Sequence, residues 1–134
     1  MTNEFSSSRP IYLQLIDKFL LAIVRGQWAP GEKMPSVRQL ALDFGVNPNT
    51  IQKSLAELEQ MGYARSERTV GRYITDDEEK IQALKKELAL KEIDRFVDQM
   101  QTLSLDCEKA CQLVERRWKE RPKTERKVPD HVIN

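Results

Sequence analysis

Residues 36–60 read SVRQLALDFGVNPNTIQKSLAELEQ, and this stretch contains two amphipathic helical patterns separated by a short break. The first opens with Ser-x-x-Gln, a capping box led by Ser36, and it stops at Gly45. The second opens with Asn47, a preferred N-cap, and Pro48, which suits the first position of a helix. Two helices that meet across so short a turn containing glycine predict a helix-turn-helix.

The sequence on either side extends this motif. Apolar residues at three- and four-residue spacing predict a helix over residues 10–25, and QWAPGEKMP at 27–35 predicts a loop or a very short strand. After the second helix of the motif, YARSERT and GRYIT are strand-like runs around Val70 and Gly71, short enough for a hairpin and interleaved with arginines. Three helices and a basic hairpin predict a winged helix.

The composition changes after Thr75. Acidic residues at 76–79 suit the start of a helix, and apolar residues continue at helical spacing for about 25 residues. Ser104 can cap a second helix, in which Cys107, Ala110, Cys111, Val114 and Trp118 mark one face.

These patterns predict a mainly α protein with a small β-hairpin wing. We expect a winged helix-turn-helix domain at 9–76, with the helix-turn-helix at 36–60 and the wing at 63–75. A C-terminal two-helix dimerisation hairpin is expected at 77–120. The remainder, 121–134, has two prolines and little periodicity, which predicts a disordered tail.

The overall charge is uninformative, because the formal net charge is only +1. Basic residues nevertheless exceed acidic ones within 33–56 and within 63–75, a modest indication of a polyanionic partner. The most apolar stretch is interrupted by Asp17 and Lys18, and no basic region precedes an apolar run at the N-terminus. We therefore expect no signal peptide and no membrane span. The only cysteines, Cys107 and Cys111, lie four apart, without the geometry that a disulfide prefers, so we also expect a cytosolic, reduced protein.

The second helix of the motif supplies the candidate DNA-reading side chains. If its apolar stripe faces the core, Asn49, Gln52 and Lys53 face away from it near the helix N-terminus, as the major groove of DNA requires. Gln52 and Asn49 can each bond an adenine bidentately, whereas Lys53 can contact phosphate or guanine. Thr50 and the exposed backbone N–H groups suit phosphate. The alternative is that these are ordinary solvated positions.

The combined pattern resembles a known family. PSVRQLALDFGVNPNTIQKSLAELEQMGYARSERTVGRYI resembles the winged-helix domain of the GntR family of bacterial transcription regulators, and the preceding PIYLQL and APGEKMPS extend the resemblance over 10–75. Asn-Pro-Asn-Thr and the short two-helix C-terminal part resemble the YtrA-like subfamily, to about residue 119. One departure is Thr69, which stands where the family usually has a wing glycine and takes a positive φ less freely.

The resemblance implies DNA contact by the arginine of Pro-Ser-x-Arg, Arg38, although a cation is unfavourable in the first turn of a helix. Its alternative role is an ion pair with Glu32 or Asp43. Arg65 and Arg68 are either wing contacts or strand-surface charges. The expected DNA-binding residues are Ser36, Arg38, Asn47, Pro48, Asn49, Thr50, Gln52, Lys53, Gly71 and Arg72.

The long C-terminal helix predicts a homodimer, because its large apolar residues would be left partly wet in a monomer. Residues expected at the dimer interface are Leu84, Leu88, Ile93, Phe96, Val97, Met100, Val114 and Trp118. A two-fold dimer predicts double-stranded DNA with a palindromic operator as the partner. The resemblance implies repression, commonly of an operon for an ABC transporter. Regulation by an unknown small-molecule effector is a further possibility. Two helices leave little room for the usual pocket of roughly 300 Å³, so we expect such an effector to act at the dimer interface.

Other chemistries are weakly supported. Cys107 and Cys111 offer too few ligands for structural zinc, which takes four, so we read them as small buried apolar residues, with a redox sensor as a weaker alternative. His131 lies in the expected tail without a visible partner. No nucleophile with a base, glycine-rich phosphate loop or perturbed carboxylate pair is evident, so we expect neither enzyme activity nor a cofactor or metal. The competing function is a winged-helix protein-interaction module without DNA binding.

Overall fold

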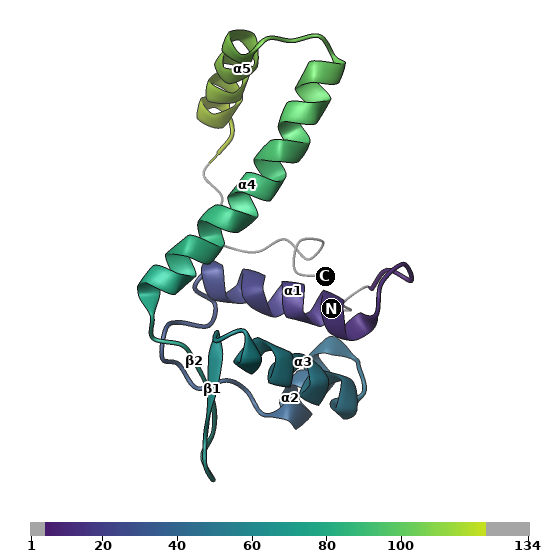
Figure 1. The fold of residues 1–134 in the computed structure, drawn as a ribbon, viewed down its shortest axis with the longest axis vertical. Helices are drawn as coiled ribbons and strands as arrows, with labels where there is room; N and C mark the ends of the chain where they lie inside the picture. The colour runs from purple at the N-terminus through teal and green to yellow at the C-terminus, as the bar shows by residue number, and fades with distance from the viewer. Residues whose placement is uncertain (1–4, 123–134) are drawn as a thin grey trace. The chain divides into compact units, whose positions relative to one another are not determined.

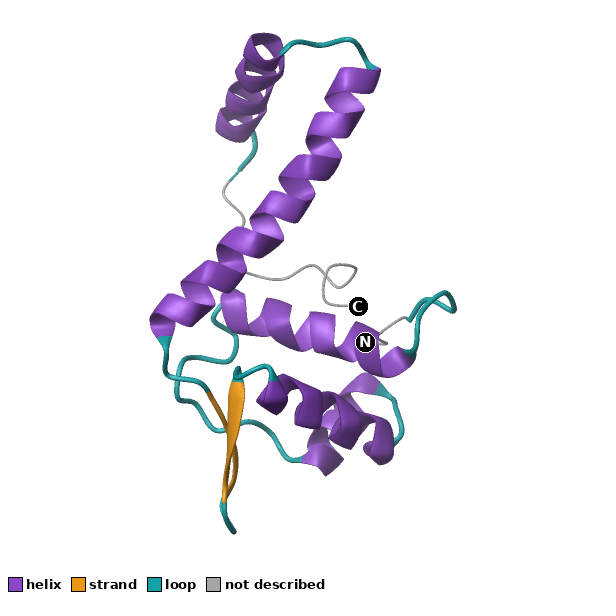
Figure 2. Ribbon diagram, in the orientation of Figure 1, coloured by secondary structure: helices purple, strands orange, loops and turns teal. Residues whose placement is uncertain are grey.

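The computed structural model describes residues 5–122. Its chain is mainly helical with one two-stranded antiparallel hairpin, as predicted (Figures 1 and 2). The elements are α1 (Ile11–Val24), α2 (Val37–Phe44), α3 (Pro48–Gln60), β1 (Ala64–Glu67), β2 (Gly71–Ile74), α4 (Glu78–Thr102) and α5 (Cys107–Glu120). The chain forms two compact units, the first running to Gln82 and the second beginning at Ala83.

The core of the first unit forms where α3 packs against both α1 and α2 (Figure 1). Leu15 and Phe19 of α1 and Ile51 of α3 are completely buried. The ring of Phe19 also packs edge-on against that of Phe44, with centroids 5.6 Å apart, and so ties the end of α2 to α1. The amphipathic stripes read from the sequence are therefore the surfaces that meet.

Local signals set the ends of the two motif helices. Ser36 accepts a hydrogen bond from the backbone N–H of Gln39 at 3.1 Å, and Gly45 ends α2 in the left-handed conformation at φ 66°. The other half of the predicted capping box, in which the Gln39 side chain would bond the backbone N–H of Ser36, is not seen. The Gln39 amide instead donates to the Asp43 carboxylate at 2.7 Å, one helical turn further on. Asn47 caps α3 by accepting from the N–H of Asn49 at 2.7 Å.

The wing is a regular hairpin in which Ala64 lies opposite Ile74 and Glu67 opposite Gly71. The segment before α2 adds a single bridge to it, between Lys33 and Tyr73, so the predicted loop or very short strand has one strand-like contact. At the tip, Thr69 has φ 67°. The position that departs from the family pattern therefore does adopt the backbone conformation that glycine favours.

The helix α4 begins in the first unit and continues into the second; it is 25 residues long, as expected, and it is followed by α5. The predicted cap of α5 is wrong. Asp106 caps the helix by accepting from the N–H of Lys109 at 2.8 Å, whereas Ser104 lies in the preceding turn at φ 62°. A carboxylate at this position also interacts favourably with the helix dipole. Nearly all of the expected tail, including His131, lies outside the described residues.

Candidate nucleic-acid interface

The N-terminal part of α3 is the centre of the candidate interface. The side chains that were expected to read DNA lie on its outer face: Asn47, Pro48, Asn49, Gln52 and Lys53 are exposed and Thr50 is half-buried. Ile51, Leu55 and Leu58 on the opposite face are at most 1 % exposed. The helix therefore presents a row of amides and a cation to solvent from a firmly packed base.

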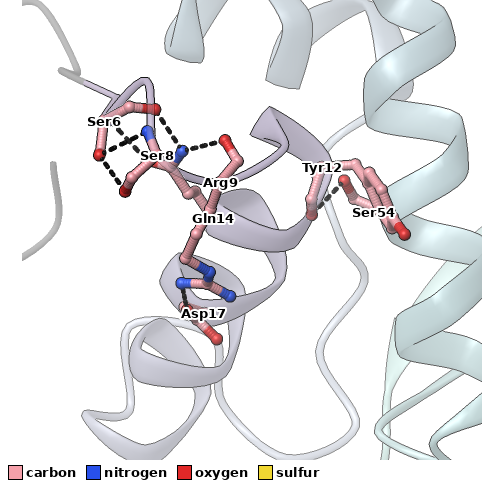
Figure 3. A network of polar contacts seen from close by, with 7 residues as sticks. All are labelled: Ser6, Ser8, Arg9, Tyr12, Gln14, Asp17 and Ser54. Carbon is pink, nitrogen blue, oxygen red and sulfur yellow. Dashed lines mark hydrogen bonds and ion pairs between the residues drawn. The ribbon is translucent and has the colours of Figure 1, made fainter.

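Ser54 anchors this base to α1. Its hydroxyl lies 3.0 Å from the carbonyl oxygen of Tyr12 (Figure 3). It lies equally close, at 3.0 Å, to the carbonyl oxygen of Thr50, and the residue is completely buried. A buried hydroxyl without a partner would be costly, so this contact favours one placement of α3 against α1. On the exposed side of α1, Arg9 forms an ion pair with Asp17 at 2.8 Å (Figure 3).

Arg72 connects the wing with α3. Its Nε lies 3.3 Å from the Glu59 carboxylate, and one of its terminal nitrogens lies 3.4 Å from the side-chain oxygen of Gln52. Glu59 also accepts from the Ser66 hydroxyl at 2.8 Å. Two predicted site residues, Gln52 and Arg72, thus contact each other directly, and Arg72 is also held by Glu59, a carboxylate that was not predicted to belong to the site.

Lys53 contacts α1. Its ammonium lies 3.9 Å from the centroid of the Tyr12 ring, a cation–π contact. Tyr12 was missed as part of the site, because no local pattern relates a residue of the first helix to one of the third. The contact holds the lysine charge near the start of α3.

The wing arginines differ in their surroundings. Arg65 forms an ion pair with Glu67 and lies over the Tyr73 ring, 5.0 Å from its centroid, which favours the reading of a strand-surface charge. Arg68 is exposed at the tip, and Gly71 is exposed with φ 135°. The tip therefore offers a cation and exposed backbone.

Two more of the residues expected to contact DNA, Ser36 and Arg38, lie at the start of α2. Ser36 is exposed, and its hydroxyl is used as the cap. Arg38 is exposed and forms no ion pair with Glu32 or Asp43, the partners of its alternative role. Its guanidinium is thus not committed to either carboxylate.

The second unit carries the apolar residues expected at a dimer interface, and most of them are accessible. Trp118 is 79 % exposed, Leu88 and Met100 are half-buried, and Leu84 is only 3 % exposed. Leu84 has almost no surface left for a partner, because its side chain is already buried within one protomer. The exposed members are Ile93, Phe96, Val97, Val114 and Trp118.

An open groove of about 1110 Å³ lies in this unit, with Phe96, Met100, Val114 and Trp118 in its lining. Two helices therefore leave more room than expected. The cysteine prediction is also wrong, since Cys107 and Cys111 are both exposed. Within residues 5–122, no three His, Cys, Asp or Glu side chains are grouped so that they could hold a metal ion, and no helix is long and apolar enough to cross a membrane.

A helix-turn-helix with a hairpin wing and an exposed polar α3 defines a winged helix-turn-helix protein. The family model "Bacterial regulatory proteins, gntR family" matches residues 11–74. The chain is 42 % identical over 105 residues to the uncharacterized HTH-type transcriptional regulator YhcF of Bacillus subtilis, covering 78 % of this chain and 87 % of YhcF. The protein therefore belongs to the GntR family, whose members are transcriptional regulators with a DNA-binding winged helix-turn-helix.

Two further similarities fit this assignment. The chain is 42 % identical over 71 residues to the HTH-type transcriptional repressor YtrA of Bacillus subtilis, covering 53 % of this chain and 55 % of YtrA. Among solved structures, a GntR family transcriptional regulator from Listeria monocytogenes has a TM-score of 0.76 at 36 % identity, covering 84 % of this chain and 98 % of that one. This second likeness extends beyond the winged helix.

Proposed function

We propose that the protein is a homodimeric repressor that binds a palindromic operator with α3 and the wing. The observation that carries the proposal is the joint presentation of Gln52 and Arg72, whose side chains lie 3.4 Å apart on two different elements. A glutamine can read a base edge in the major groove, whereas an arginine can contact the backbone or minor groove beside it.

The reading surface is expected to comprise exposed side chains at the N-terminus of α3. Asn49 and Gln52 are free of core packing and can bond adenine bidentately, and Lys53 adds a cation that suits phosphate or guanine. Asn47, Pro48 and Thr50 bring the backbone N–H groups of the helix start to a phosphate. From α2, Ser36 and Arg38 extend this surface, and Gly71 lets the wing backbone approach the duplex.

The dimer is supported by the apolar surface of the second unit. Ile93, Phe96, Val97 and Val114 are between 37 and 50 % exposed, and Trp118 is more exposed still. Burial of a fully exposed side chain of this kind contributes roughly 1.5 to 3 kcal/mol, so covering the exposed part of each of the four contributes up to about half of that, and a partner that covers them together is favoured. A two-fold dimer reads half-sites about 34 Å apart, or a multiple of this, on one face of the duplex.

Repression is supported by similarity, since the relative YtrA is named a transcriptional repressor. A dimer seated on an operator can exclude the transcription machinery from the same DNA. The resemblance to the YtrA-like subfamily favours an operon such as one for an ABC transporter as the target. Such a regulator would act in the cytoplasm, where the DNA lies.

Fluorescence anisotropy with the DNA upstream of the protein's own gene tests this function. The control is a shuffled duplex of the same length and base composition, and both are titrated at several salt concentrations. Specific sites are typically bound at least about 10³-fold more tightly than non-specific DNA at physiological salt. Equal affinity for the two duplexes, with no shared motif recovered from a random DNA pool, would favour the protein-interaction module instead.

A further inference from the structure

Two thiols form a pair on the exposed surface of α5. Cys107 and Cys111 are both exposed, and their sulfur atoms lie 3.8 Å apart. They are four residues apart on a regular helix, a spacing that stacks the two side chains on one face. The chain has only these two cysteines, so the pair has no competing thiol.

The separation of the sulfurs fits two ligands on one metal ion. Thiolate sulfur lies about 2.3 Å from a tetrahedral zinc ion, so two sulfurs on one such ion lie about 3.8 Å apart. A disulfide instead requires the two sulfurs to approach to about 2.05 Å. The helix therefore holds the thiols at a distance that a single ion can span without backbone movement.

Protons and a metal ion compete for the two thiol sulfurs, because a thiol binds metal only after it has lost its proton. Metal affinity should therefore increase with pH as bound metal displaces the thiol protons.

We propose that Cys107 and Cys111 together are a bidentate thiolate site for a soft divalent metal ion of the zinc and cadmium type. Soft sulfur ligands select such ions over magnesium or calcium. Two thiolates fill two of the four tetrahedral positions. Solvent fills the other two, because no described residues add a third ligand to the pair. The site is independent of the proposed DNA surface on α3.

The test is a titration of the reduced, untagged full chain with Cd²⁺. Binding is measured by the ultraviolet charge-transfer absorbance of cadmium thiolate and by the release of protons. One ion per protomer and an affinity that rises with pH are expected. Cys107→Ser and Cys111→Ser should each weaken binding by at least about tenfold, since loss even of groups that only orient metal ligands costs this much. Circular dichroism checks that these exposed positions leave the fold intact.

A matched control keeps two thiols but changes their spacing. In the double variant Cys111→Ser, Gln112→Cys the second thiol is five residues from the first, and consecutive helix positions are about 100° apart, so the thiols no longer share a face. This variant should bind no better than Cys111→Ser. Equal affinity of the double variant and the wild type, or no cadmium thiolate absorbance in the wild type, would overturn the site. A stoichiometry of half an ion per protomer would contradict the proposal that solvent completes the coordination, and it would indicate instead one ion held by the four thiolates of two copies.

Discussion

The guanidinium of Arg72 in β2 lies 3.4 Å from the side-chain oxygen of Gln52 in α3, and 3.3 Å from the carboxylate of Glu59 on the same helix. Arg72 of the wing thus holds the side chain of Gln52, which we propose reads a base edge. Because Arg72 is shared between an amide and a carboxylate, a phosphate that approaches the wing competes with Glu59 for it. The interface is a set of linked side chains rather than isolated contacts.

The first prediction concerns Gln52. Gln52→Ala should relax discrimination at one base pair by about 1 to 3 kcal/mol, because a bidentate contact to a base edge is lost. The measurement is anisotropy against operator variants that each carry one substituted base pair. Gln60→Ala is the matched control, since Gln60 is an exposed glutamine at the other end of α3. A uniform loss across all operator variants would contradict base reading by Gln52.

Lys53→Ala should behave differently. A lysine that contacts phosphate contributes to all sequences alike, so its loss should weaken specific and shuffled duplexes similarly and reduce the salt slope by about one. The check is a salt titration of the variant on both duplexes. Lys53→Arg keeps the charge and should keep the slope. If Lys53→Ala instead changes the preference at a single base pair, the lysine reads guanine and the phosphate role is wrong.

Much of the first unit could be predicted because its signals are local. Gly45, Asn47 and Pro48 each act within a few residues, through a positive φ, a cap and a fixed dihedral, and the structure has all three effects. The cap of α5, where the prediction was wrong, is also a local signal, but there two acceptors compete. Asp106 and Ser104 lie close together, and only the turn geometry decides which of them faces the free N–H groups of α5.

The links within the candidate site could not be predicted. Arg72 with Gln52, and Lys53 with Tyr12, join elements that are distant in sequence, and no periodicity relates their side chains. The cysteines show a related difficulty. A helical pattern places Cys107 and Cys111 on one face of α5, but it does not say whether another element covers that face.

A third prediction separates the two asparagines of Asn-Pro-Asn. Asn47→Ala should lower the free energy of unfolding by about 0.5 to 2 kcal/mol, because the N–H of Asn49 loses its 2.7 Å cap. Asn49→Ala should change it by less than about 0.5 kcal/mol, since that side chain is exposed. Urea unfolding measures both, and anisotropy should show the larger loss of operator preference for Asn49→Ala. Equal destabilisation by the two substitutions would contradict the division of roles.

The wing tip supplies a fourth prediction. Thr69 has φ 67°, a conformation that costs a residue with a Cβ roughly 1 to 2 kcal/mol. Thr69→Gly should therefore raise the free energy of unfolding by up to about 1 kcal/mol, with part of the gain offset by the entropy of glycine in the unfolded chain. Val70→Gly is the control at a neighbouring position without a positive φ, and it should be destabilising. Thermal unfolding of the two variants tests this prediction. A loss of stability in Thr69→Gly would contradict backbone strain at Thr69.

The proposed dimer predicts a specific effect at Trp118. This side chain is 79 % exposed, so Trp118→Lys should leave the unfolding of a protomer nearly unchanged. At an interface, a buried tryptophan commonly contributes 2 kcal/mol or more, so the dimer dissociation constant should rise by roughly 30-fold or more. Sedimentation velocity over a range of protein concentrations measures this. The matched control, Gln112→Lys, adds the same charge at an exposed position on another face of α5.

Loss of the dimer should also separate half-site from full-site binding. Trp118→Lys should bind a duplex with one half-site as well as the wild type does, because α3 and the wing are unchanged. Its affinity for the palindrome should fall towards the half-site value, since the second contact is no longer held at a high effective concentration. An unchanged dissociation constant for the dimer, with normal binding to the palindrome, would exclude Trp118 from the interface and direct attention to Ile93 and Val97 on α4.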